Sequence, residues 1–281
     1  MLVTSKEMLI LARQEGHAIP APDYIDLDSA RAYVSAAEKV QKPLILSYAQ
    51  AHSYMISLEE AALIGKFVAE QANVPICLHL DHGTDIKFIK KAITLGFTSV
   101  MIDASMKSFE ENVNLTKEVV KFAHPLGVVV EAEIGHVGSG INYENHKKCD
   151  SVYTTVKDAL NFVSLTNVDS LAVSIGTAHG IYKGIPMINF KRLQELSTAL
   201  SIPLVLHGGS ESGDDNLYLC ATQGISKINI FTDFMISAMK MIEDEKPKNY
   251  FELKENVNRG MENVLVHYYK VFNKKEGDIH E

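Results

Sequence analysis

Cysteine and long apolar runs are both scarce in this 281-residue chain. The three cysteines, Cys77, Cys149 and Cys220, are scattered and form no C-x-x-C pair. The sequence therefore predicts neither a disulfide framework nor a cysteine zinc cluster. This usage fits a reducing compartment, so we expect a cytoplasmic protein. No apolar run approaches the roughly 20 residues of a membrane span, and residues 1–18 are typical of an amphipathic helix, not of a signal peptide.

Basic residues are in the minority. The chain has 27 Lys and Arg against 35 Asp and Glu, a formal net charge of −8. Binding of nucleic acid usually needs clustered basic side chains, so we expect no nucleic-acid partner and no membrane partner. An acidic surface does not exclude a locally positive pocket for a small anion. Hydrophobic residues make up 46% of the chain, an ordinary globular composition for a chain long enough to bury one large core.

Short apolar runs recur, and each is followed by a stretch that looks helical. Eight runs are candidate strands: residues 17–20, 44–48, 76–80, 99–102, 128–134, 171–175, 204–206 and 227–231. Nearly all-apolar strands that alternate with helices are typical of a parallel sheet covered on both faces. Eight units in this length favour a (β/α)8 TIM barrel over an open doubly wound sheet. Since no linker interrupts the pattern, we expect one domain over residues 1–281, with a helical C-terminal extension.

Local signals mark the ends of the predicted helices. Ser57 with Glu60, and Ser108 with Glu111, fit the capping box S-x-x-E. Thr155 with Asp158 is a weaker version of the same pattern. Gly96 and Gly224 stand where helix C-caps favour glycine.

Three histidines stand at the carboxyl ends of predicted strands, where barrel enzymes place their catalytic groups. His82 and His207 close the runs at 76–80 and 204–206, and His179 follows the run at 171–175. Three protein ligands with an open fourth position are the arrangement of a catalytic zinc ion. The pattern therefore favours a metal site. The alternative for each histidine is a hydrogen-bonded polar group at the edge of the core.

Carboxylates follow the same strands. Asp81 precedes His82, and we weigh three roles for it: orienting an imidazole, exchanging a proton with a reacting oxygen, or capping the helix predicted after Gly83. Adjacent residues point different ways at a strand end, so Asp81 need not bind the ion. Asp103 and Glu133 also end strands, where they could face the pocket or form hydrogen bonds at its rim.

Two turns on successive late strands are candidates for binding phosphate. Gly208, Gly209 and Ser210 follow one strand, and residues 229–232 end the next and open a helix. Turns and helix N-termini bind phosphate through free N–H groups, and barrels commonly hold phosphate after strands seven and eight. The alternative is simple turn chemistry. Residues 135–151 form the longest irregular stretch, and loops of that length are usually functional or mobile.

These motifs together resemble the class II, zinc-dependent ketose-bisphosphate aldolases, which include the fructose- and tagatose-bisphosphate enzymes. The resemblance runs from about Pro43 to Asp233. Its strongest stretches are LHLDHGTD, GFTSVMIDAS, FEENV, VEAEIG, VDSLAVSIGTAHGIYKG, PLVLHGGS and KINIFTD.

The resemblance implies a role for each matched residue. Asp81 would transfer the proton, and His82, His179 and His207 would bind Zn²⁺. Asp103 and Glu133 match an alternative metal site. Arg259 is a candidate for a second phosphate. The substrate contacts would be Gly180, Lys183, Gly208, Gly209, Ser210, Asn229, Ile230, Phe231 and Thr232.

The implied reaction cleaves a phosphorylated ketose to dihydroxyacetone phosphate and an aldehyde, in a homodimer or homotetramer. Glu144 is the candidate for the base that handles the C3 proton, because the loop after VEAEIG lacks the usual acidic cluster. Residues 19–23 replace the family's Phe-Asn pair, and Ala49 stands where a phosphate-contacting serine is common. These departures keep two other functions open: an aldolase for a modified sugar phosphate, and a sugar-phosphate-binding protein with little turnover. A zinc hydrolase, which would use water in the open metal position, is a further alternative.

Overall fold

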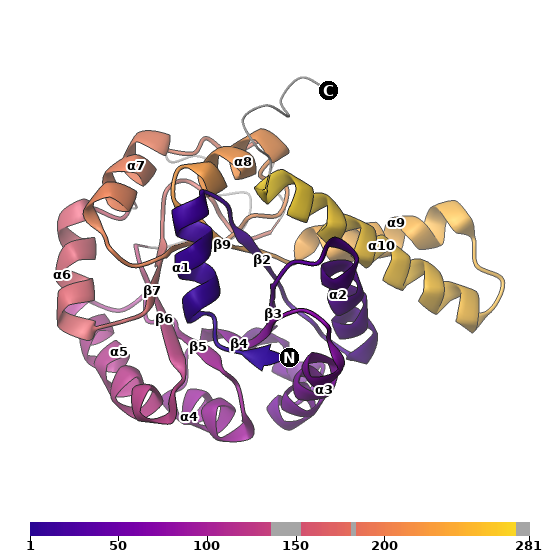
Figure 1. Cartoon of the computed structure of the whole chain (residues 1–281), viewed down its shortest axis with the longest axis horizontal. Helices are drawn as coiled ribbons and strands as arrows, with labels where there is room; N and C mark the ends of the chain where they lie inside the picture. Colours follow the sequence, from indigo (N-terminus) through magenta and orange to yellow (C-terminus); the bar gives the residue numbers. More distant parts are fainter. Residues whose placement is uncertain (136–152, 181–183, 274–281) are drawn as a thin grey trace.

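The computed structural model of this chain describes residues 1–135, 153–180 and 184–273. Parallel strands curl into a sheet that helices surround, and α1 lies across one end of the strands (Figure 1). This is the single α/β domain that the alternating pattern predicts. The elements are β1 (Leu2–Val3), α1 (Lys6–Glu15), β2 (Ile19–Pro22), α2 (Leu27–Val40), β3 (Leu44–Ala49), η1 (Gln50–Tyr54), α3 (Leu58–Gln71), β4 (Ile76–Gly83), α4 (Ile86–Leu95), β5 (Ser99–Ile102), α5 (Phe109–Ala123), η2 (His124–Leu126), β6 (Val129–Ile134), α6 (Val156–Thr166), β7 (Ser170–Val173), α7 (Phe190–Ala199), β8 (Leu204–Leu206), α8 (Asp214–Thr222), β9 (Ile225–Ile230), α9 (Thr232–Glu245) and α10 (Tyr250–Phe272).

The sheet runs in the order β1-β4-β5-β6-β7-β8-β9-β2, and β3 also pairs with β4. The expected closed ladder is interrupted between β2 and β3, where one isolated bridge joins Asp23 to Ser47. The Tyr24 N–H donates to the Ser47 carbonyl at 2.9 Å. Pro20 and Pro22 stand four and two residues before Tyr24 in the chain, so their backbone nitrogens also point toward β3. A proline nitrogen carries no hydrogen and cannot donate to that strand. The two prolines thereby explain the gap in the ladder.

The helix caps follow the sequence signals. Ser57 and Ser108 form capping boxes with Glu60 and Glu111, and Thr155 caps α6. Gly96 ends α4 in the left-handed conformation. Gly224 is different, because α8 ends one residue earlier, at a C-cap on Gln223.

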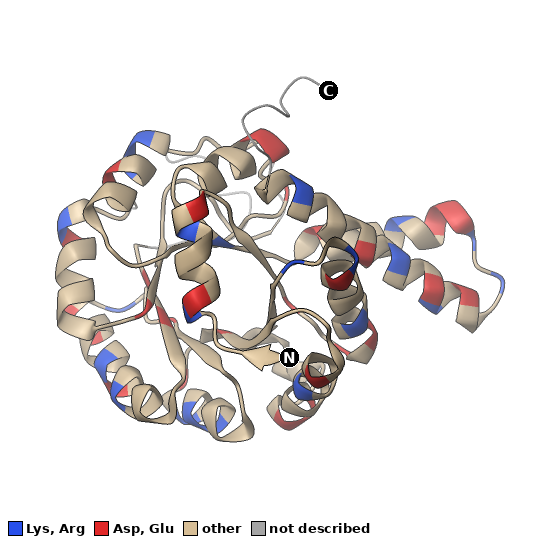
Figure 2. Ribbon diagram, in the orientation of Figure 1, with Lys and Arg blue, Asp and Glu red and all other residues tan. Residues whose placement is uncertain are grey.

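The core lies mainly between the sheet and its helices, with a smaller apolar cluster of Leu9, Ala12, Ile19, Ala21, Ile45 and Cys77 under α1. Cys77 and Cys220 are free and buried, and Cys149 lies outside the described residues. No described helix has the length and apolar character to span a membrane. Acidic and basic residues are interspersed along the outer helices (Figure 2).

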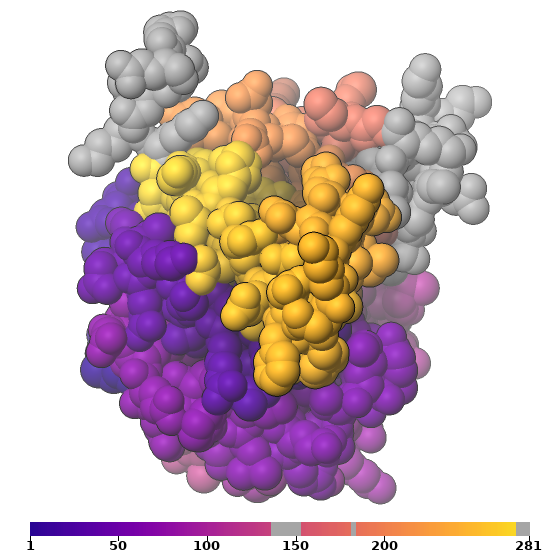
Figure 3. All heavy atoms as spheres, turned by 90° about the vertical axis from the view of Figure 1, so that its right-hand side faces the viewer, coloured from indigo at the N-terminus to yellow at the C-terminus, as the bar shows by residue number. Residues whose placement is uncertain are grey.

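The helices α9 and α10 pack on each other, and their joined ends project from the rest of the molecule (Figure 1); Figure 3 looks onto these ends. Arg259, on α10, pairs with Glu245 and Asn256 and lies outside the central cleft described below. Several large apolar side chains on these helices are exposed, among them Met239, Tyr250 and Phe251.

Candidate metal centre and active site

An irregularity at the end of β4 positions the first two residues of the site, Asp81 and His82. The pairing of β4 with β5 shifts register between Leu80 and Gly83, and His82 has a φ of 45°. A bulge disturbs strict alternation of side chains, and a left-handed non-glycine residue stores strain that is typical of functional sites. Asp81 and His82 consequently both line the same cleft, with His82 Nε2 3.8 Å from Asp81 Oδ2.

The structure brings the three predicted histidines together from β4 and from the segments after β7 and β8. One ring nitrogen each of His82, His179 and His207 lies within 4.8 Å of the other two. His207 Nδ1 is 2.8 Å from His82 Nε2. The rings of His82 and His179 meet edge-on, with centroids 4.9 Å apart.

Carboxylates behind two of the rings fix their orientation. His82 Nδ1 is 2.8 Å from Asp103 Oδ2, and His207 Nε2 is 3.0 Å from Glu131 Oε1. This leaves His82 Nε2 and His207 Nδ1 facing each other. Metal-binding imidazoles commonly use their second nitrogen in this way.

The electrostatics favour a cation at this point. Burial opposes charge on His82, but Asp81 and Asp103 outweigh it and raise the pKa of His82 to about 10. Burial lowers the pKa of His207 well below its usual value, so that ring is held neutral. Burial alone would raise the pKa of Asp81, but the positive charges of His82 and Lys227 lower it to about 2. A neutral imidazole and ionised carboxylates are the donor set that a divalent metal requires.

Two further groups of donors lie close by. His82, Asp103 and Glu133 also offer ligand atoms within 4.8 Å of one another, as the resemblance anticipates for an alternative metal position. His79, Asp81 and Glu131 do the same deeper in the sheet. There the Lys227 ammonium lies 3.0 Å from His79 Nε2 and 2.8 Å from Glu131 Oε2, so a lysine supplies the cation.

The apolar-run pattern does not predict this deeper cluster of His79, Glu131 and Lys227. A signal is nevertheless present in the sequence. Each of these residues stands two positions before a polar residue at the end of the same strand, so both side chains point to the same face: His79 with Asp81, Glu131 with Glu133, and Lys227 with Asn229. Polar residues that repeat every second position in apolar strands indicate an inward-facing polar layer. The apolar content of the runs alone does not reveal this layer.

Asp81 does not cap a helix. The N-cap of α4 is Asp85, whose side chain accepts from the Lys87 N–H. Asp81 is buried, and the Asn229 side-chain amide donates to its Oδ1 at 2.8 Å. The side chain of Asn229, predicted as a phosphate contact, therefore holds Asp81 in place.

Parts of the turns at residues 208–210 and 229–232 line the same cleft. The cleft has a volume of about 350 Å³ and is lined by Asp23, Ala49, Ala51, His52, Asp81, His82, His179, Gly180, Gly208, Ser210, Asn229, Ile230, Phe231 and Thr232. Gly208 has a φ of 69°, and a Cβ there would lie 2.3 Å from the Ala178 carbonyl oxygen. This close approach requires glycine.

Two predicted phosphate contacts have other partners. Gly209 does not line the cleft, and its N–H donates to the Asn229 carbonyl at 3.0 Å. The Ser210 hydroxyl accepts from the Phe231 and Asp233 N–H groups at the start of α9. Glu144 and Lys183 lie outside the described residues.

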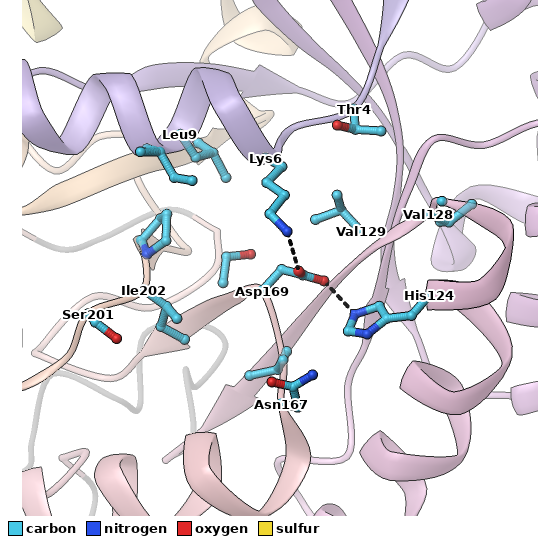
Figure 4. A pocket seen from close by; sticks show the side chains of 15 residues that line it. Thr4, Lys6, Leu9, His124, Val128, Val129, Asn167, Asp169, Ser201 and Ile202 are labelled. Atoms are coloured by element: carbon cyan, nitrogen blue, oxygen red, sulfur yellow. Dashed lines mark hydrogen bonds and ion pairs between the residues drawn. The ribbon is translucent and has the colours of Figure 1, made fainter.

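A larger cavity of about 600 Å³ lies at the opposite, amino ends of the strands. Asp169 is at its centre and pairs with His124 at 2.8 Å and Lys6 at 4.0 Å (Figure 4). His82 and His179 of the metal cluster line the smaller cleft, so cavity size does not identify the site.

The fold places the cleft and the three histidines at the carboxyl ends of parallel strands, which is where α/β barrel enzymes hold their catalytic groups. Residues 3–277 match the model of the family described as fructose-bisphosphate aldolase class-II. The chain therefore belongs to that family, which consists of metal-dependent lyases.

Similar proteins support this assignment. YdjI of Escherichia coli K12 is 38% identical over 239 residues, which cover 85% of this chain and 86% of that protein. A fructose-bisphosphate aldolase of Staphylococcus aureus is 38% identical over 247 residues, covering 86% and 85%. The crystal structure of the YdjI aldolase covers 99% of both chains with a TM-score of 0.88 and 33% identity. That of a putative fructose-1,6-bisphosphate aldolase of Coccidioides immitis covers 95% of both, with a TM-score of 0.85 and 28% identity.

Proposed function

We propose that this protein reversibly cleaves a phosphorylated ketose to dihydroxyacetone phosphate and an aldehyde, with Zn²⁺ bound by His82, His179 and His207. The observation that carries the proposal is the convergence of three imidazole nitrogens within 4.8 Å of one another, beside the buried carboxylate of Asp81. Three imidazole nitrogens suit zinc as donors, and the surrounding carboxylates balance its charge. When bound, the metal supplies Lewis-acid stabilisation of the negative charge that develops on the ketone oxygen.

Asp81 is the group that exchanges a proton with the C4 oxygen. Its pKa of about 2 keeps it ionised, so in cleavage it accepts the C4 hydroxyl proton as the C3–C4 bond breaks. In condensation it returns that proton to the new alkoxide. The Asn229 amide orients the carboxylate through its 2.8 Å hydrogen bond.

The wall formed by Gly180, Gly208, Ser210 and residues 229–232 is where we place the phosphate of the dihydroxyacetone half. The glycines keep side-chain atoms away from the ligand, and the start of α9 contributes the positive end of a helix dipole. Lys183 would add a positive charge to this phosphate. Glu144 would remove and return the C3 proton of dihydroxyacetone phosphate.

The family assignment supports further proposals about the whole molecule. We place the protein in the cytoplasm, as one domain over residues 1–281. Its sheet is a (β/α)8 barrel whose seam lies between β2 and β3. We also propose a homodimer or homotetramer, supported by the exposed apolar side chains of α9 and α10. The mass of the purified protein in solution tests the oligomer, and a monomer at micromolar concentration would exclude it.

The catalytic proposal is tested with the purified zinc-loaded protein. Fructose 1,6-bisphosphate, tagatose 1,6-bisphosphate and fructose 1-phosphate are each offered for cleavage, and C3 proton exchange of dihydroxyacetone phosphate is followed by NMR in deuterated water. Cleavage of any of these ketoses supports the proposal. Exchange without cleavage favours an aldolase for a modified ketose phosphate. The observation that favours this second candidate is that Asp23 and Ala49 stand where the family commonly has other residues. Binding without exchange would contradict aldolase activity.

A further inference from the structure

One end of the cleft carries polar groups for which the proposed reaction has given no role. Asp23 lies just beyond β2, and His52 lies on η1 after β3. Both line the cleft that contains Asp81. The strand register places Ala21 opposite Asn229 and Ala49 opposite Asp81, so this end adjoins the residue proposed to act on the C4 oxygen.

Each of these two side chains has one buried polar atom without a hydrogen-bond partner among the described residues. Asp23 is 8% exposed, and neither its Oδ1 nor His52 Nδ1 bonds to any other described group. A buried polar atom that makes no hydrogen bond destabilises the fold. Such atoms point to a ligand that supplies the missing bonds, since they line a cleft open to small molecules.

The chemistry of this end suits hydroxyl groups and not a second phosphate. Its described lining is Asp23, Ala49, Ala51, His52 and Asp81, with neither Lys nor Arg among these residues. Burial, and then the charge of Asp81, raise the pKa of Asp23 well above its usual value. The charge of Asp81 thus disfavours even a single further negative charge on Asp23. A phosphate dianion at the same place would be disfavoured more strongly.

His52 is equally suited to a neutral ligand. Burial lowers the pKa of its imidazole, against the opposing effect of Asp81. Its ring lies against Phe231 with centroids 4.6 Å apart, which fixes the imidazole at the border with the phosphate wall. A neutral imidazole nitrogen and a carboxyl group can each exchange hydrogen bonds with a sugar hydroxyl.

We propose that Asp23 and His52 recognise hydroxyl groups on the aldehyde half of the substrate, so that the aldehyde product carries no phosphate. The substrate is then a ketose phosphorylated only on its dihydroxyacetone half. This inference rests on the proposed aldolase function and narrows its substrate class.

The test uses the zinc-loaded full-length protein in the direction of condensation. Dihydroxyacetone phosphate is combined with D-glyceraldehyde or with D-glyceraldehyde 3-phosphate, and kcat/KM is measured for each. We expect at least about a tenfold preference for the unphosphorylated aldehyde, the size of discrimination that a few polar contacts give. A preference of the same size for glyceraldehyde 3-phosphate would overturn the inference.

Variants at Asp23 test whether this side chain causes the preference for the unphosphorylated aldehyde. Asp23→Ala should reduce kcat/KM for D-glyceraldehyde by about tenfold or more, the loss expected for a contact to a polar ligand. Asp23→Asn keeps a donor and an acceptor and should restore most of it. Neither change removes a hydrogen bond to a described group, so the melting temperature should not fall. Asp85→Asn is the matched control, since it removes an exposed carboxylate outside the cleft and keeps a good N-cap.

Proton exchange of dihydroxyacetone phosphate, measured without an aldehyde, distinguishes failure of the aldolase proposal from failure of the proposed aldehyde specificity. This half-reaction does not need the aldehyde, so it should be the same in the wild type and in Asp23→Ala. Exchange with no preference for the unphosphorylated aldehyde would contradict this inference and leave the aldolase proposal standing. Absence of exchange in the wild type would contradict the aldolase proposal itself.

Discussion

The Lys227 ammonium lies 2.8 Å from the Glu131 carboxylate, and both groups are buried within the curled sheet. Glu131 also accepts from His207 Nε2, and Lys227 contacts His79. A buried lysine therefore anchors the carboxylate that sets the tautomer of a proposed metal ligand. This arrangement connects the inside of the sheet with the chemistry at its carboxyl end.

Replacement of Glu131 should reduce both stability and metal affinity. Glu131→Gln leaves Lys227 with an uncompensated buried charge, which we expect to cost about 3–5 kcal/mol of unfolding free energy. Loss of the carboxylate behind His207 should weaken zinc binding about 10- to 100-fold. Urea unfolding and competitive zinc titration measure the two effects. The control is Glu118→Gln, which breaks an exposed pair with Lys90 and should cost less than about 1 kcal/mol.

The double variant Glu131→Gln, Lys227→Met tests whether the ion pair is the cause. Removing both charges should destabilise the fold less than Glu131→Gln alone, because no buried charge is left without its partner. Zinc affinity should stay low, since His207 still lacks its carboxylate. Additive losses of stability would contradict this explanation.

Asp81→Asn should separate cleavage from proton exchange. The amide cannot accept the C4 hydroxyl proton, so the rate of ketose cleavage should fall roughly 10²- to 10⁴-fold. Exchange of the C3 proton of dihydroxyacetone phosphate, measured by NMR, should change much less. If cleavage and exchange fall by the same factor, Asp81 does not act specifically at C4.

Glu144→Gln should show the opposite pattern. We place Glu144 at the C3 proton, so exchange should slow by roughly 10²-fold or more, while the affinity for dihydroxyacetone phosphate stays nearly constant. An unchanged exchange rate would remove Glu144 from the reaction.

Gly208→Ala tests the close approach at the phosphate wall. Both Gly208 and Gly127 have φ near 70°, but only Gly208 would bring a Cβ against the backbone, at Ala178. Gly127→Ala should cost about 1–2 kcal/mol for the left-handed conformation. Gly208→Ala should cost more and should also raise the KM for the phosphorylated ketose. Equal losses of stability with an unchanged KM would contradict the assigned role.

The eight main strands and their helices could be predicted because the apolar runs and capping residues are local signals. The interruption between β2 and β3 was foreseeable in part, because Pro20 and Pro22 stand within the strand. The two-residue β1 is too short to give a periodic signal. The left-handed conformation of His82 has no local signature either, because it belongs to the bulge in β4.

The site was only partly predictable for a similar reason. Histidines at strand ends are visible in sequence, and their convergence follows from the fold class. The contact of Asn229 with Asp81 joins residues 148 positions apart, and the pairing of Lys227 with Glu131 spans 96. Such pairings depend on side-chain direction across the sheet, which spacing along the chain does not specify.

The most direct test of the central claim is a crystal structure of the zinc-loaded protein with the anomalous signal of zinc recorded at its absorption edge. The account predicts one strong peak about 2.0–2.1 Å from a ring nitrogen of each of His82, His179 and His207. A zinc ion bound without His179 and His207, for instance by His82, Asp103 and Glu133, would contradict it.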